Sequence, residues 1–143
     1  MADDATPSAH TKHGDLTLDQ IGEQLPGMAR LMVEVSDRYW ILYYAAKGGN
    51  WQLARHELSE LRKAFKLACI VRPKYLESLE TFDAELLTPI DRAIKEKDFA
   101  VFEAAYQSAT DDANAKHVDL GYSYIDWRLP DTPPGHLRLD SGE

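Results

Sequence analysis

Apolar side chains recur at alternating steps of three and four residues in four successive segments, and this spacing constrains the fold more than any other feature. In the first segment the apolar positions are Met28, Met32, Val35, Tyr39, Leu42 and Ala46. Similar stripes run through residues 51–68, 76–93 and 99–120. This spacing places the apolar side chains on one face of a helix. Each segment is therefore expected to form an amphipathic helix that buries its stripe against a neighbour.

Short breaks separate these segments. Gly48 and Gly49 end the first helix, and Asn50 is a favourable N-cap for the second. Pro73 ends the second helix, because the residue before a proline avoids helical dihedral angles. Asp98 is the N-cap of the fourth. Helices joined by two or three residues are antiparallel neighbours, so the sequence predicts an all-α protein, an antiparallel up-down-up-down four-helix bundle.

The third helix is predicted over about residues 74–97, with an interruption at Pro89. A proline inside a helix removes a hydrogen bond and clashes with the preceding turn. Thr88 and Pro89 could also serve as the N-cap and first residue of a new helix. We therefore expect a kink or a break at this point.

Three regions are predicted along the chain. Residues 1–16 are expected to form a disordered arm, and residues 17–121 the helical bundle, which includes a short helix over residues 18–24 capped by Thr17. Residues 122–143 contain three prolines and have no periodicity, so they are expected to form an extended tail. The aromatic side chains of Tyr122, Tyr124 and Trp127 predict that the tail is partly packed on the bundle.

Composition excludes several functional classes. The chain has 143 residues, enough for one domain with its own core, and a formal net charge of -8. An acidic chain does not favour nucleic-acid binding, and no apolar run is long enough for a membrane span. Without a signal peptide the expected location is cytoplasmic, or periplasmic if the chain is a trimmed mature form. The single cysteine, Cys69, excludes an internal disulfide and is expected to be buried.

Aromatic side chains are concentrated where the first two helices meet, among them Tyr43 and Trp51. One interpretation is a pocket for a flat ligand, with Arg38 or Arg55 to bind an acidic group. The other is a closely packed end of the bundle, since aromatic stripes at helical spacing usually belong to the core.

Motifs for catalysis and for metal binding are missing from the sequence. There is no strained Gly-x-Ser-x-Gly turn, no phosphate-binding loop and no Glu-x-x-His pair of a di-iron bundle. His56 and Glu60 are four residues apart but lie off the apolar stripe, so a surface pair is expected. A non-enzymatic protein is therefore predicted, with no metal site apart from His117 if haem is bound.

The run Ala-Asn-Ala-Lys-His at residues 113–117 lies near the end of the fourth helix. Together with its flanks and with the Gly48-Gly49-Asn50-Trp51 turn, it resembles the cytochrome c-prime type of four-helix bundle, and more narrowly a group of short helical c-type cytochromes. The resemblance covers about residues 26–134. That family carries a Cys-x-x-Cys-His haem-attachment motif in the last helix. Here Ala113 and Lys116 stand at the two cysteine positions, which rules out covalent haem, and His117 remains at the position of the axial ligand.

The resemblance leaves several functions open. The first is a binding module for a small molecule or a protein partner, with a site formed by Met32, Tyr39, Tyr43, Trp51, Phe65 and His117. The second is non-covalent haem binding through His117, for electron transfer or sensing. The third is general-base catalysis by His117 near Asp119. The resemblance also implies a possible homodimer through the first two helices.

Overall fold

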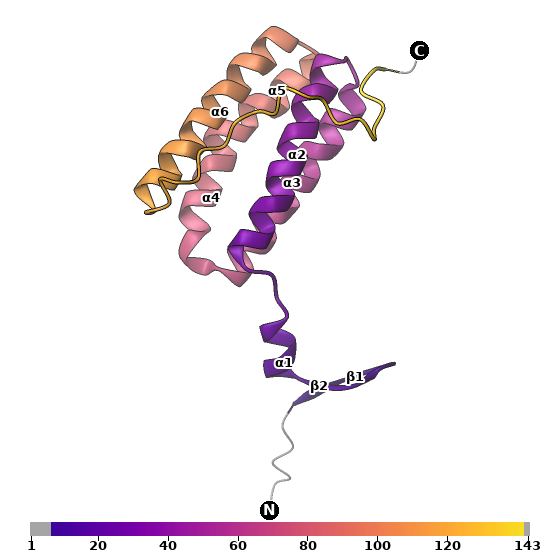
Figure 1. Ribbon diagram of the computed structural model, residues 1–143, viewed down its shortest axis with the longest axis vertical. Coiled ribbons are helices and arrows are strands. Elements are labelled where there is room, and N and C mark those ends of the chain that lie inside the picture. Colours follow the sequence, from indigo (N-terminus) through magenta and orange to yellow (C-terminus); the bar gives the residue numbers. More distant parts are fainter. Residues whose placement is uncertain (1–6, 142–143) are drawn as a thin grey trace, which may run out of the picture.

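The computed structural model describes residues 7–141 and is mostly helical (Figure 1). The main helical segments are α2 (Met28–Lys47), α3 (Trp51–Val71), α4 (Leu76–Phe82), the π-helical η2 (Asp83–Leu87), α5 (Thr88–Glu96) and α6 (Phe99–Asp119). We call these segments the helical body. Within it, α2 packs against α3 and α6, and α5 packs against α3 and α6. None of the helices in the described residues has the length and apolar character needed to cross a membrane.

The apolar stripes meet in one core. The most deeply buried large side chains come from every main helix except α4 and include Leu42, Leu58, Leu61, Ile90 and Phe102, each at most 1% exposed. Deleting a side chain of this size from such a position costs about 2–5 kcal/mol. The core thus provides the main stabilisation of the helical body.

The predicted helix ends are largely confirmed. α2 ends at Lys47, the Asn50 side chain accepts a hydrogen bond from the Leu53 amide, and the Asp98 side chain accepts one from the Val101 amide. These caps satisfy amide groups that have no partner within their own helix.

The third predicted helix is more irregular than the sequence suggests. It begins with a 3-10 turn, η1 (Pro73–Tyr75), and is interrupted by the π-turn η2, which ends two residues before Pro89. The Thr88 amide bonds to the carbonyl of Asp83, five residues back, and the Thr88 hydroxyl donates to the same carbonyl at 3.1 Å. Pro89 has no amide hydrogen to donate, and the π-turn before it allows the helical chain to continue in the same direction.

Residues 8–17 form a hairpin of β1 (Ser8–Thr11) and β2 (Gly14–Thr17), which corrects the expectation of a disordered arm there. Gly14 adopts a φ of 127° that permits the tight turn, and His10 Nδ1 lies 2.6 Å from the carboxylate of Asp15 across it. The hairpin and α1 (Leu18–Glu23) project from the end of the helical body (Figure 1). Residues 1–6, also within the predicted arm, lie outside the described residues.

The tail returns along α2 towards the turn between α2 and α3 (Figure 1). Polar side chains of the helical body hold its backbone at several points. Trp40 Nε1 donates to the Thr132 carbonyl, and the Tyr44 hydroxyl donates to the carbonyl of Pro130 at 2.7 Å. Farther along, Pro134 is fully buried. These contacts attach the tail to the helices, although Tyr124 itself is 77% exposed.

Candidate functional site

A cavity of about 580 Å³ lies between α2, α4 and α6 and is closed on one side by the tail. Its floor is formed by Leu61, Phe65 and Leu87, all buried. At its rim are more exposed side chains, among them Val33 and Leu120. The cavity thus has a buried apolar floor and an opening to solvent, and its size is typical of a small-molecule site.

Several polar side chains of the cavity wall are bonded to other protein groups. The Tyr39 hydroxyl donates to the Tyr106 carbonyl at 2.8 Å and lies 3.0 Å from the Thr110 hydroxyl. Trp127 Nε1 donates to the Ser36 hydroxyl at 2.9 Å. Because these groups are hydrogen-bonded within the protein, they do not need a polar partner from a ligand, and this part of the wall can contact an apolar molecule.

Tyr39 and Tyr106 form a stacked pair beside the cavity, with ring centroids 4.0 Å apart. The Tyr106 hydroxyl donates to the Tyr39 carbonyl at 2.7 Å, so each hydroxyl bonds to the backbone of the other helix. Burial raises the pKa of both phenols above the ordinary range. Neither hydroxyl can therefore serve as an acid or base near neutral pH, and the pair acts as a rigid wall.

His117 borders the cavity from the last turn of α6. Its Nδ1 lies 3.2 Å from the backbone carbonyl of Ile125 in the tail. A carbonyl can only accept, so Nδ1 carries the hydrogen, and in the neutral ring Nε2 keeps its lone pair. Asp119 takes no part in this hydrogen bond, which leaves general-base catalysis by this pair without geometric support.

Lys116 also borders the cavity. Its Nζ lies 3.4 Å from Oδ2 of Asp112, one turn earlier on α6. That separation is longer than the distance of about 2.7–2.9 Å that is usual for a charge-assisted hydrogen bond. Asp112 Oδ2 is buried and has no hydrogen-bond donor. The ion pair is loose, so the ammonium group keeps donors for another acceptor.

The predicted site residues divide into two groups. Met32, Tyr39, Phe65 and His117 all line the cavity. Tyr43 and Trp51 are absent from the lining and pack instead with the ring of Phe102, in the neighbouring part of the core. The Tyr43 hydroxyl donates to Glu103 at 2.7 Å. The aromatic cluster at the α2–α3 junction is thus packed core, and the cavity lies farther along the helices.

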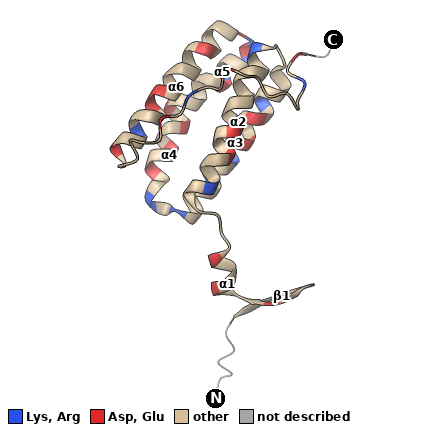
Figure 2. Cartoon of the chain, in the orientation of Figure 1, with Lys and Arg blue, Asp and Glu red and all other residues tan. Residues whose placement is uncertain are grey.

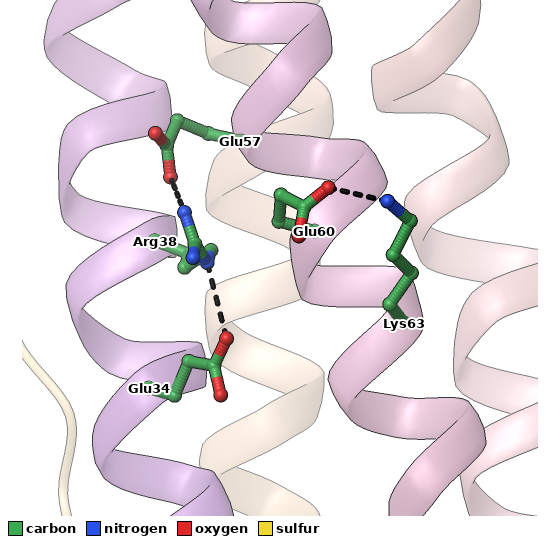
Figure 3. Close-up of polar contacts among 5 residues, drawn as sticks. All are labelled: Glu34, Arg38, Glu57, Glu60 and Lys63. Carbon is green, nitrogen blue, oxygen red and sulfur yellow. Dashed lines mark hydrogen bonds and ion pairs between the residues drawn. The ribbon is translucent and has the colours of Figure 1, made fainter.

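Arg38, an expected partner for an acidic ligand, is already bound by two carboxylates (Figure 3). Its guanidinium donates to Glu57 at 3.0 Å and to Glu34 at 3.3 Å. Glu57 is only 4% exposed, so its carboxylate is buried where α2 meets α3. In the same view Glu60 accepts a hydrogen bond from Lys63 at 2.6 Å, as expected for a surface residue.

Several cavity residues were not expected from the sequence. They are Tyr75, Leu79 and Phe82 on the η1–α4 segment and Ile125 and Trp127 in the tail. Leu79 and Phe82 belong to the apolar stripe of the third predicted helix, so periodicity placed them inside without showing that they face a space. Asn114 anchors Trp127, with its side chain bonded to both the amide and the carbonyl of that residue, at 2.8 and 3.0 Å.

Ala113, Lys116 and His117 all border this one cavity. Among known proteins, no family model, curated protein or solved structure matches the chain.

Proposed function

We propose that this chain is a four-helix bundle of the cytochrome c-prime type that has lost covalent haem attachment and binds an apolar small molecule without catalysing a reaction. The observation that carries the proposal is the cavity of about 580 Å³, whose floor is apolar and in which Tyr39 and Trp127 are already hydrogen-bonded within the protein. Ligand burial in such a space gains the free energy of removing apolar surface from water.

The location of the cavity supports the proposed relationship. Ala113 and Lys116 stand at the cysteine positions of the haem-attachment motif, and His117 stands at the position of its axial ligand. All three border the same space. A cavity retained at the position of a lost prosthetic group is a natural place for a different ligand, because the helices around it already have the required separation.

Calorimetric titration with dodecanol, a neutral apolar probe, tests this proposal. We expect saturable binding to the unmodified protein. Ala113→Phe should abolish binding by filling the cavity, while Ala115→Phe, on the exposed side of the same helical turn, should preserve it. Circular dichroism checks that both variants remain helical. Equal binding by the three proteins, or no binding by any, would refute the proposal.

Non-covalent haem binding is a second candidate, favoured by the hydrogen bond from His117 to the Ile125 carbonyl. This bond fixes the hydrogen on Nδ1 and leaves Nε2 available, as in many metal-binding histidines. His117 fits the role of axial ligand, whereas Ala113 and Lys116 cannot form thioethers. A bound haem would supply redox or gas-binding chemistry.

Titration with hemin distinguishes this candidate from the first. Axial ligation predicts a saturable Soret band that His117→Ala removes, while dodecanol binding persists in that variant. A spectrum identical in the two proteins would exclude ligation by His117.

A further inference from the structure

We infer that the ligand of the cavity is an amphiphile with an apolar body and a single anionic head group, and that Lys116 binds the head group. This inference rests on the proposed function, because it requires that the cavity holds a small molecule.

The apolar body is indicated by the floor. Leu61, Phe65 and Leu87 offer no hydrogen-bonding side-chain group, and the nearby Tyr39 hydroxyl is bonded to the Tyr106 carbonyl. A polar group placed there would lose its hydrogen bonds to water without replacement, at a considerable cost. The part of the ligand that reaches the floor must therefore be apolar.

The polar end is indicated by the last turn of α6. Lys116 and His117 border the cavity there, and the Lys116 side chain is 33% exposed. Its 3.4 Å contact with Asp112 leaves donors unused. A carboxylate, sulfonate or phosphate head could accept these donors while remaining in contact with water.

The charges around the site favour an anion at Lys116 over other positions. Asp37 also borders the cavity but is exposed on α2, where solvent weakens its repulsion. Asp112 faces Lys116 yet does not line the cavity. Arg38 is bonded to Glu34 and Glu57, and neither Arg38 nor Arg55, the arginines expected to bind an acid, lines the cavity. Lys116 is thus the cation best placed to bind the head group.

Matched probes that share one apolar chain test the inference. Dodecanoate, dodecanol and dodecyltrimethylammonium are titrated by calorimetry below their micelle concentrations. We expect dodecanoate to bind about tenfold more tightly than dodecanol, the effect of one hydrogen bond to a charged group, and the cationic probe to bind most weakly. Lys116→Met should remove the advantage of dodecanoate. Lys66→Met, which changes an exposed lysine outside the cavity lining, should leave it intact.

Each outcome has a distinct meaning. Equal affinities for dodecanoate and dodecanol, unchanged in Lys116→Met, would overturn the anionic head group and leave the proposed function standing. Tighter binding of the cationic probe would also overturn it. If no probe binds the unmodified protein, both the proposed function and the inference fail. Circular dichroism, together with retained dodecanol binding by Lys116→Met, excludes loss of folding as the cause of a weakened response.

Discussion

At the scale of single residues, the reciprocal pair of Tyr39 and Tyr106 is the most constrained contact beside the cavity. Each hydroxyl donates to the other residue's backbone carbonyl, at 2.8 and 2.7 Å, and the rings stack at 4.0 Å. The pair joins α2 to α6 with both polar and apolar contacts. It therefore fixes the separation of two helices that form the cavity walls.

Tyr106→Phe should lower the free energy of unfolding by about 1–2 kcal/mol, because it removes a buried hydrogen bond to the Tyr39 carbonyl while keeping the ring. Tyr44→Phe is the matched control, since its hydroxyl bonds to the tail near the surface, and should cost less. Urea denaturation measures both. Equal losses would show that the buried pair has no special role.

Tyr43 gives a prediction for alkaline pH. Burial, followed by the hydrogen bond with Glu103, raises its pKa to about 12. In the unfolded chain tyrosine titrates near about pH 10, so the folded state holds the proton more tightly. The contribution of Tyr43 is intact below about pH 10 and is lost as the pH rises towards about 12.

Unfolding free energy should therefore fall across that window, and less steeply in Tyr43→Phe. Denaturant unfolding at a series of pH values, with tyrosinate absorbance recorded in parallel, measures the effect. A pH dependence that is identical in the two proteins would contradict it.

At the scale of secondary-structure elements, the tail depends on close backbone contact at Gly48. A methyl group at this position would overlap the carbonyl of Leu139. Gly48 has a φ of -81°, which alanine adopts without strain, so the effect of a substitution is steric. The neighbouring side chain of Asn50 donates to the Arg138 carbonyl at 3.0 Å, which fixes the same part of the tail.

Gly48→Ala should detach the end of the tail while leaving α2 and α3 intact. Hydrogen exchange should show faster exchange in residues 135–141 and little change in the core. Gly22→Ala, where an added methyl group meets open space, is the control. Unchanged protection of the tail from hydrogen exchange in Gly48→Ala would show that the added methyl group fits beside the Leu139 carbonyl.

The contact between α2 and α3 includes a nearly buried ion pair. Glu57 is 4% exposed and accepts a hydrogen bond from Arg38 at 3.0 Å. Arg38→Met should destabilise the protein by about 3 kcal/mol, because it leaves a buried carboxylate without a partner. Glu34→Gln, which alters the more exposed partner of Arg38, should cost less than about 1 kcal/mol. Urea denaturation of both variants tests the difference, and similar losses would contradict the assigned role of Glu57.

The elements differ in how far the sequence predicts them. The ends of α2, α3 and α6 follow from Gly48, Asn50, Pro73 and Asp98, because caps and breaks are local. Pro89 marks a disturbance, but the choice of a π-turn over a break depends on what packs around it. Residues 8–17 carry no strong strand pattern, so the hairpin was missed.

Periodicity also explains which of the predicted residues line the cavity. It places Met32, Tyr39, Phe65 and His117 on inward faces, and the structure brings these four to one cavity. It also places Tyr43 and Trp51 on inward faces, because a helical stripe shows which way a side chain points and not whether the space it faces is filled. The cavity walls supplied by Trp127 and Tyr75 depend on distant contacts that a local pattern cannot reveal.

At the scale of the whole molecule, the distribution of charge bears on the binding of an anionic ligand. Acidic and basic residues are interspersed along the helices, and basic residues occupy the turn between α3 and α4 (Figure 2). The formal net charge of -8 gives the molecule an overall field that disfavours anions. Selection of an anionic amphiphile would therefore depend on local contacts at Lys116 and on burial of the apolar chain.

The tail also forms part of the cavity. It supplies Ile125 and Trp127 to the cavity wall and accepts the hydrogen bond of His117. The proposed ligand would therefore share contacts with the tail, and its binding should slow hydrogen exchange in the tail as well as in the helices that line the cavity.

Binding of an anionic amphiphile in the cavity is tested most directly by a crystal structure of the complex with dodecanoate brominated at its terminal carbon. Anomalous scattering locates the bromine independently of the rest of the map. A bromine peak is expected beside Phe65 and Leu87, with the carboxylate at Lys116. A peak outside the cavity, or a chain in the cavity with its carboxylate at the floor, would contradict it.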